Sequence, residues 1–312
     1  MSDEDHGSAQ PGGDGDGPAT GGSDGEGTAA SQSAVEDAIP DLDADDAIEA
    51  DGNDEPTDAT DDEPEHTPDD HPRSEDLETR HRIEAGVEKG ITHLQGMHAE
   101  GRGTAFDYLL GEETIPSADE AARAAAAQLL LAEHAVLSVN GNVAALVPEE
   151  YVELADVVDA DLEVNLFNRT EERMETIAEH LREHGADEVK GLEGDGEVPE
   201  VGHYRGIVDA DGIEDADVVL VPLEDGDRAE ALGKMGKTEI VIDLNPLSRS
   251  PQTATIPIVD NVVRAIPTIT EHARKLRADG ATREDLEAIV DSFDAQDHLW
   301  AAEEQIRTAA WE

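Results

Sequence analysis

Apolar residues recur with two different periods from about residue 135 onward, and together these periods predict strands that alternate with helices. Short, almost wholly apolar runs predict buried strands at 135–140, 161–167, 215–223, 238–246 and 255–260. Between them, TEERMETIAEHLREHG, which Thr170 is expected to cap, and the stretch around EALGKMG have the spacing of amphipathic helices. The alternation indicates βαβ units, and therefore an α/β fold: a Rossmann-like, mostly parallel sheet with flanking helices.

Helices are also expected before the first of these strands. Apolar residues recur at helical spacing from Leu77 to Val87, and a glycine-bounded loop at 101–103 should follow them. Ser117 and Glu120 then form a capping-box pattern, which predicts the start of a long helix rich in alanine.

The end of the chain is predicted to be helical as well, because HARKLRADG, REDLEAIVDSF and AAEEQIRTAAW have helical spacing. From these patterns we expect one α/β domain at 71–312. Its parts are a helical N-terminal part at 71–134, a parallel-sheet core at 135–265 and C-terminal helices at 266–312.

Composition sets residues 1–70 apart from the rest. They hold 24 of the 77 Asp and Glu residues and none of the 21 Lys and Arg residues, and they are rich in Gly, Ser, Thr and Pro. Such a segment buries too little apolar surface to fold, and its charges repel one another. We expect a disordered, acidic N-terminal tail that keeps the protein solvated, with partner binding through the tail as the alternative.

The formal net charge of −56 narrows the classes of function. No basic surface is expected to neutralise nucleic-acid phosphates or an anionic membrane, so both kinds of partner are disfavoured. The absence of Cys, of a secretory leader and of an apolar run of about 20 residues indicates a cytoplasmic protein. Because molar salt shortens the Debye length to about 3 Å, we interpret the acidity as a halophilic adaptation.

Polar residues follow the predicted strands at the edge where an open parallel sheet binds its ligands. The candidates after the first three strands are Asn140, Asn142, Arg169, Asp225 and Asp227. Each has a structural alternative. The two Asn residues suit turns and caps as well as ligand contacts, and the two Asp residues suit a helix start as well as Mg²⁺.

Arg102 and Arg249 stand out in a chain with so few cations. Arg102 lies between two glycines and Arg249 follows a strand end, and a polyanionic ligand would explain both, because Arg offers paired donors to phosphate. The sequence NRT at 168–170 raises an NADP-dependent oxidoreductase as an alternative. The Gly-rich fingerprint of such enzymes is reduced to Gly141 here, and no P-loop sequence occurs.

Six longer strings resemble a single enzyme family. In chain order they are GRGTAFDYLLGEETI, SVNGNVAALVPEE, EVNLFNRTEER, ADVVLVPLEDGDRAEAL, DLNPLSRS and IVDNVVRAIP. Together they are similar to the archaeal 4-phosphopantoate–β-alanine ligase family, also called phosphopantothenate synthetase. The similarity starts near His71 and leaves out the acidic tail.

The resemblance implies a homodimeric, Rossmann-like ligase of coenzyme A biosynthesis. Such an enzyme joins 4-phosphopantoate to β-alanine with ATP, and the expected products are 4′-phosphopantothenate, AMP and diphosphate. By similarity, the residues expected to contact ATP are Arg80, Arg102, Asp243, Leu244, Asn245, Arg249, Ser250, Asn261 and Val262.

AMP formation fits an acyl-adenylate route, which needs aligned reactants and cations that stabilise charge growing on phosphate oxygens. We hypothesise that Arg102 and Arg249 supply this stabilisation. Candidates for Mg²⁺ are Asp225, Asp227 and Asp243, and candidates for contacts to 4-phosphopantoate are Asn140, Asn142 and Arg169.

Overall fold

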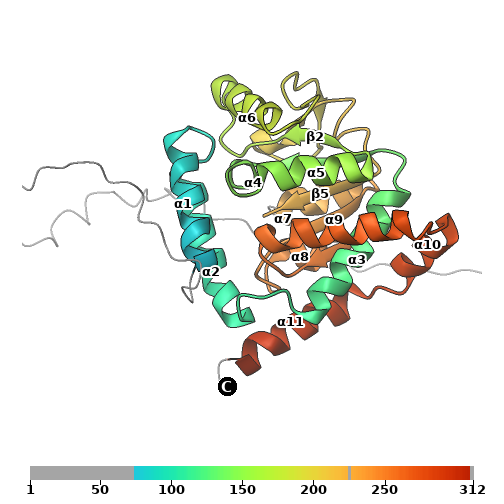
Figure 1. Cartoon of the computed structure of the whole chain (residues 1–312). Helices are drawn as coiled ribbons and strands as arrows, with labels where there is room; N and C mark the ends of the chain where they lie inside the picture. Colours follow the sequence, from blue (N-terminus) through green and yellow to red (C-terminus); the bar gives the residue numbers. More distant parts are fainter. Residues whose placement is uncertain (1–73, 224–225, 310–312) are drawn as a thin grey trace, which may run out of the picture. The chain divides into compact units, whose positions relative to one another are not determined.

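A computed structural model describes residues 74–223 and 226–309, and the predicted acidic tail lies outside this part of the chain. Five parallel strands form the main sheet in the order β2-β1-β5-β6-β7 (Figure 1). They are β1 (Ala135–Val139), β2 (Asp161–Val164), β5 (Val218–Pro222), β6 (Thr238–Ile242) and β7 (Ile256–Ile258). The parallel sheet and its flanking helices confirm the predicted α/β fold.

The sheet is buried on both faces, which explains why its strands appear as continuous apolar runs in the sequence. Side chains alternate along β1, so that Leu137 and Val139 join one apolar core and Val136 joins the other. Because neither face of the central strands meets water, the alternation of apolar and polar residues typical of a half-exposed strand is missing.

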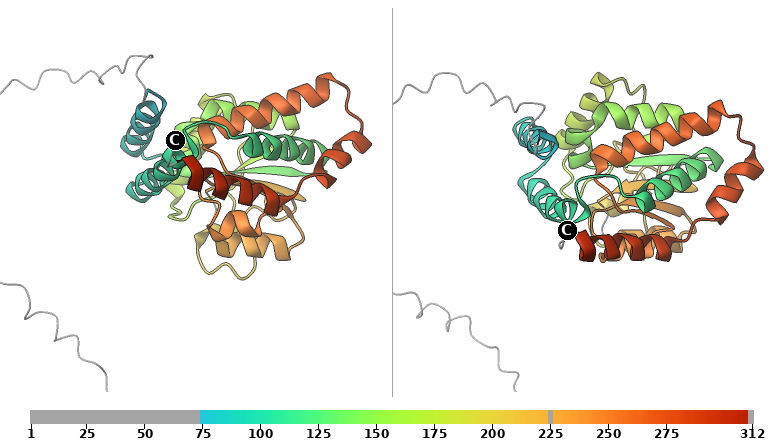
Figure 2. Two further views of the ribbon diagram at one scale, coloured as in Figure 1. Left: turned by 90° about the horizontal axis from the view of Figure 1, so that it is seen from below. Right: turned by 60° about the horizontal axis from the view of Figure 1, so that its bottom comes forward.

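Helices cover the two faces of the sheet. The first core contains residues of α3 (Pro116–Leu131), α5 (Pro148–Val158) and α9 (Val262–Ala278), and the second contains residues of α7 (Gly226–Lys234). Figures 1 and 2 show α3, α5 and α9 on one side of the strands and α7 on the other. The remaining helices of this part are α4 (Gly141–Leu146), α6 (Glu171–Glu183), α8 (Arg249–Thr253) and α10 (Arg283–Asp291).

Two helix starts differ from the sequence predictions, and one agrees. α3 begins at Pro116 after Ile115, whose side chain makes no capping bond, so the capping box predicted at Ser117 is wrong. Proline suits the first helical position because its φ is preset and its missing N–H would have no partner there, which moves the start forward. α9 begins at Val262, ahead of the predicted boundary at 266, whereas Thr170 caps α6 as expected.

A small antiparallel ladder was not predicted. It pairs β3 (Gly196–Glu197) with β4 (Ile207–Val208), and the turn η3 (Tyr204–Gly206) precedes β4. Strands of two residues carry too little periodic pattern to be recognised in a sequence.

Three helices from opposite ends of the chain lie together. They are α1 (Ser74–Glu88), α2 (Leu94–Leu110) and α11 (Ala295–Ala309). α1 confirms the predicted helix, and α2 packs against α11, with Leu110 and Leu299 in one apolar cluster (Figure 2). α1 and α2 both contact α4, which follows β1, so the N-terminal part reaches the carboxyl ends of the strands.

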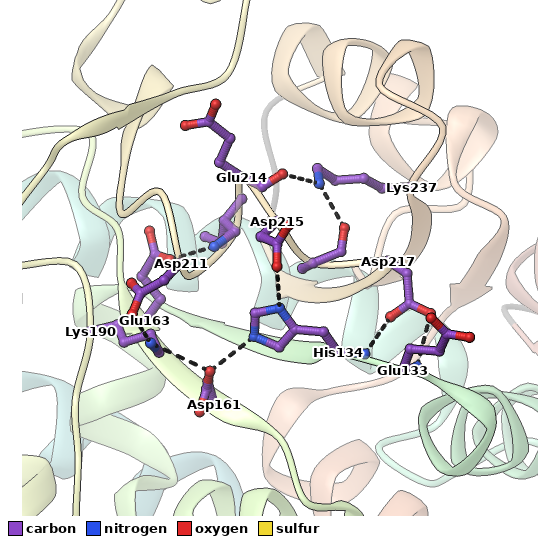
Figure 3. Close-up of polar contacts among 12 residues, drawn as sticks. Glu133, His134, Asp161, Glu163, Lys190, Asp211, Glu214, Asp215, Asp217 and Lys237 are labelled. Atoms are coloured by element: carbon purple, nitrogen blue, oxygen red, sulfur yellow. Dashed lines mark hydrogen bonds and ion pairs between the residues drawn. The ribbon is translucent and has the colours of Figure 1, made fainter.

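The opposite edge, at the amino ends of β1, β2 and β5, is held by a polar cluster (Figure 3). His134 Nε2 lies 2.9 Å from Asp161 Oδ2, and the Asp217 carboxylate accepts the backbone N–H of His134. Lys237 Nζ donates to two backbone carbonyls of the turn at 214–216, each at 2.7 Å. The charged groups at this edge are therefore engaged in structural contacts.

His298 on α11 makes the protein sensitive to acid. Its Nε2 accepts the backbone N–H of Val259, and burial lowers the pKa of this histidine from 6.5 to about 4. A depressed folded pKa contributes stability above pH 6.5, and this stability is lost as the pH falls towards 4. We expect His298→Gln to remove roughly 2 kcal/mol of the decrease in unfolding free energy between pH 7 and pH 5.

Urea titrations of wild type and His298→Gln at both pH values measure this difference. The matched control is His81→Gln, since His81 is exposed on α1. Equal pH slopes in wild type and His298→Gln would contradict the prediction. Across the residues that the structure describes, no helix has the length and apolar character needed to cross a bilayer.

Candidate active site

A cleft of about 510 Å³ lies at the carboxyl ends of the strands, bordered by α2. Chain order reverses in the sheet between β1 and β5, and ligands of open parallel sheets bind at this switch point. The cleft is lined after β1 by Asn140, after β5 by Leu223 and after β6 by Asp243. Of the residues predicted from the sequence, those that line it are Arg102, Asn140, Asn142, Asp243, Asn245 and Ser250.

Asn140 is a helix cap and also part of the cleft wall. Its Oδ1 accepts the backbone N–H groups of Asn142 and Val143, and its Nδ2 donates to the Pro222 carbonyl at 2.8 Å. The capping alternative considered for Asn140 is therefore confirmed. Because one side chain joins the end of β1 to the end of β5, Asn140 fixes the position of the switch point itself.

Asn142 connects α4 to α2. Its Oδ1 accepts the Thr92 hydroxyl at 2.6 Å, and its Nδ2 donates to the Gly96 carbonyl at 2.9 Å. A side chain on Gly141 would lie 2.7 Å from the Ile91 carbonyl oxygen, so only glycine allows the backbones to approach this closely. The sequence suggested a tight turn at Gly141, and the structure places Gly141 at the start of α4 instead.

The loop predicted at 101–103 is wrong, since these residues lie inside α2. Glycine lowers helix propensity by about 1 kcal/mol, but packing against the rest of the protein overrides that preference. A side chain on Gly103 would lie 3.2 Å from Leu244 Cδ1, and one on Gly96 would lie 2.3 Å from Asn142 Oδ1. The glycines therefore bring α2 close to the strand ends, and this places Arg102 in the cleft wall.

Asp243 organises the loop that follows β6. Its two carboxylate oxygens accept the Asn245 backbone N–H at 2.9 Å and the Ser248 hydroxyl at 2.8 Å. Burial raises the pKa of Asp243, while these hydrogen bonds and the charge of Arg102 oppose the rise. Arg102 and Asp243 are thus coupled electrostatically at one side of the cleft.

Arg249 and Asp227, which the sequence assigned to phosphate and metal, form an ion pair with each other. Arg249 is largely exposed and does not line the cleft, although its neighbour Ser250 does. Asp225 lies outside the described residues. Among the residues that are described, no group of three His, Cys, Asp or Glu side chains is placed to hold a metal ion.

Asn261 caps α9 by accepting the Val263 N–H, and its Nδ2 donates to Asp107 Oδ2 at 2.8 Å. Leu244 and Val262 are buried in the apolar cores. Any ligand contact of these two residues is therefore a backbone contact.

Arg169 also has a structural partner, because its Nη2 donates to the Gly191 carbonyl at 2.8 Å, and it does not line the cleft. Arg80 lines a second cavity of about 330 Å³ on the other side of α2, where it pairs with Asp76. The sequence-based candidates thus divide into a group in the cleft and a group outside it.

Two arginines that sequence reasoning missed line the cleft. Arg173 donates to the backbone carbonyls of Asn168 and Ile91, and its Nε is buried without a hydrogen-bond partner among the described residues. Arg205 is buried, and its Nε donates to Asn165 Oδ1. Arg173 ends the string EVNLFNRTEER, which was a usable signal, whereas no pattern surrounds Arg205.

The fold and the cleft define a class of protein: a parallel α/β protein that receives an anionic small molecule at the carboxyl ends of its strands. Residues 117–309 match the family described as phosphopantothenate/pantothenate synthetase, and the chain belongs to this family.

Similar proteins from two archaea agree with the family match. A 4-phosphopantoate–β-alanine ligase of Thermococcus kodakarensis is 56% identical over 216 residues, which are 69% of this chain and 82% of the relative. A ligase of the same name from Methanosarcina mazei is 50% identical over 244 residues, 77% of this chain and 95% of the relative. The family predicted from the sequence is confirmed, and the oxidoreductase alternative receives no support.

Proposed function

We propose that this protein is an ATP-dependent ligase of coenzyme A biosynthesis that joins 4-phosphopantoate to β-alanine, as the names of its relatives indicate. The products are 4′-phosphopantothenate, AMP and diphosphate. The structural observation that carries the proposal is the gathering of Arg102, Arg173 and Arg205 in one cleft of a chain with net charge −56. Two substrates that bear phosphate groups account for such a concentration of cations.

ATP is assigned to the side of the cleft formed by α2 and the loop after β6. There Arg102 meets the loop of Asp243, Leu244 and Asn245, and Ser250 lies beside them. Asn261 and Val262 adjoin this side through the contact of Asn261 with α2. For Arg80 and Arg249, which lie outside the cleft, ATP contact requires their side chains to move from their present partners.

4-Phosphopantoate is assigned to the side of the cleft near Asn140 and Asn142. Arg173 and Arg205 lie on this side as donors for its phosphate or carboxylate, and Arg169 acts on this side by holding the loop at Gly191. The amide groups of Asn140 and Asn142 are already bonded within the protein, so we assign them the role of shaping the wall.

The chain's own residues align the reactants and neutralise charge. The carboxylate of 4-phosphopantoate attacks the α-phosphorus of ATP, a C–O–P linkage forms, and diphosphate leaves. The amine of β-alanine then attacks the carbonyl carbon of the acyl-adenylate, and AMP leaves with the C–O bonding electrons. Arg102 stabilises charge on the phosphate oxygens, and the narrow cleft holds both partners in line.

Mg²⁺ fits this site in a limited way. Asp243 is a cleft-lining carboxylate, and Mg²⁺ typically binds one or two carboxylates together with substrate phosphates. Asp243 would hold the ion, which would neutralise phosphate charge. Asp227 is occupied by Arg249, and this pairing makes it a weaker candidate than Asp243.

Further features belong to the same proposal. Residues 1–70 form an acidic tail and 71–312 form the ligase domain, with the divisions at 134/135 and 265/266 predicted from the sequence. The excess of acidic residues adapts a cytoplasmic enzyme to concentrated salt. The active form is a homodimer, as the family resemblance implies.

An endpoint assay tests the proposed function. The full chain is incubated with ATP, Mg²⁺, 4-phosphopantoate and β-alanine in roughly 2 to 3 M KCl, where repulsion between acidic residues is screened. AMP and diphosphate are expected only when both co-substrates are present, because amide formation consumes the adenylate. Reactions lacking either substrate are the controls.

The nucleotide product distinguishes the alternatives. ADP and phosphate would retain the ligase and replace the adenylate with an acyl-phosphate. No nucleotide turnover with both substrates present would refute the proposed function.

A further inference from the structure

Glu100 on α2 is a buried carboxyl group that the proposed reaction does not use. Its residue is only 7% exposed, and it lines the second cavity, between α1 and α2. The side chain of Asn142, which belongs to the wall of the main cleft, hydrogen bonds to the Glu100 carboxyl. Glu100 therefore lies between the second cavity and the main cleft.

α2 is attached to each loop that carries a proposed ATP contact. At its start, the Gly96 carbonyl accepts Asn142 Nδ2, and one turn later Glu100 meets the same side chain. Near its end, Asp107 accepts Asn261 Nδ2 at 2.8 Å. Arg102 lies between these attachments, and its position in the cleft depends on how closely α2 is seated.

The groups around Glu100 make its charge unfavourable in this seated arrangement. Burial raises the pKa of Glu100 from 4.5 to about 7, the charge of Asp107 adds to the rise, and the Asn142 hydrogen bond opposes it. α1 contributes Arg80, whose charge is balanced by Asp76, and the exposed Glu84.

The other elements around Glu100 add little charge. α2 contributes the Tyr108 hydroxyl, and α4 contributes the uncharged Asn142. No neighbouring cation is therefore dedicated to the Glu100 carboxylate among the residues described around it.

We infer that Glu100 is a positioning residue, which as a neutral acid seats α2 against the strand ends and thereby couples ATP binding to the uptake of a proton. A raised folded pKa means that the seated arrangement is most stable below pH 4.5 and loses stability as the pH rises through about 7. ATP contacts Arg102 when α2 is seated, so ATP binding favours the protonated carboxyl. The inference rests on the proposed binding of ATP.

Calorimetry of ATP binding to the full chain tests this coupling without any catalytic turnover. Titrations at pH 7.5 in buffers of different ionisation enthalpy give the number of protons taken up with the nucleotide. We expect Glu100→Gln to take up fewer protons than wild type, because glutamine keeps a hydrogen bond to Asn142 but does not titrate. The matched control is Glu84→Gln, which removes an exposed carboxylate from the same cavity.

Affinity gives an independent readout. Between about pH 6.5 and about pH 8.5, the ATP affinity of wild type should fall at least about threefold more than that of Glu100→Gln. Glu84→Gln should follow wild type. A purely structural role of Glu100 would instead weaken binding by the same factor at both pH values.

Three outcomes overturn the inference. Equal proton uptake in wild type and Glu100→Gln is the first, and an affinity ratio that does not change with pH is the second. The third needs no variant: wild type that binds ATP with no proton uptake between about pH 6 and about pH 8. Wild type that binds no ATP at all would refute the proposed function itself, and so the two failures are distinguishable.

Discussion

Arg102→Ala is expected to lower kcat for AMP formation at least about a hundredfold, because cations preorganised around a developing negative charge contribute this much in closed sites. Arg102 lines the cleft, and its charge acts on the pKa of Asp243, so it reaches the part of the site assigned to ATP. Arg102→Lys keeps the charge without the paired donors and should recover part of the loss. Initial rates at saturating substrates in molar KCl measure both effects.

The control for this prediction is Arg123→Ala, because Arg123 is exposed on α3 outside the cleft. Arg249→Ala should show a smaller loss than Arg102→Ala, since Arg249 pairs with Asp227 away from the cleft lining. Near-normal turnover in Arg102→Ala would remove this residue from the mechanism.

Arg264→Ala is expected to lower the free energy of unfolding by about 3 to 5 kcal/mol, because it leaves two buried carboxylates without their cation. Arg264 Nη2 lies 2.5 Å from Asp107 Oδ1 and 2.9 Å from Asp260 Oδ1. Burial already raises the pKa of Asp260, and the charge of Arg264 is the main influence that opposes the rise. Urea titration in molar KCl measures the change.

Arg283→Ala is the matched control, since Arg283 forms an exposed ion pair with Glu287 one helical turn away. Exposed pairs of this kind contribute at most about 1 kcal/mol. A similar small effect of Arg264→Ala would mean that Asp107 and Asp260 are stable in the fold without their shared cation.

The strands could be predicted because the buried parallel sheet leaves a direct trace in the sequence. Each central strand is apolar on both faces, and the order of the strings that resemble the ligase family follows the order of the strand ends. Local capping was predictable for a related reason. Thr170 and Asn140 bond to backbone N–H groups two or three residues away, so the partners are fixed by the sequence itself.

The cleft could be predicted only in part. Arg102 and the Asp243 loop were identified, but α2 was interpreted as a loop because glycine disfavours isolated helices. Arg205 carried no local signal, since its position in the cleft depends on Asn165, which is 40 residues away. Arg249 was assigned to phosphate because cations are rare in this chain, and no sequence pattern indicated its pairing with Asp227.

The sequence by itself therefore determined the parallel sheet, the caps, the family and the acidic character of the protein. These depend on apolar period, near neighbours in the chain and composition. Only the tertiary structure decided which arginines share the cleft, that α2 is helical through its glycines and that Glu100 is buried beside Asn142. These features arise because contacts between distant segments outweigh local preferences of about 1 kcal/mol per residue.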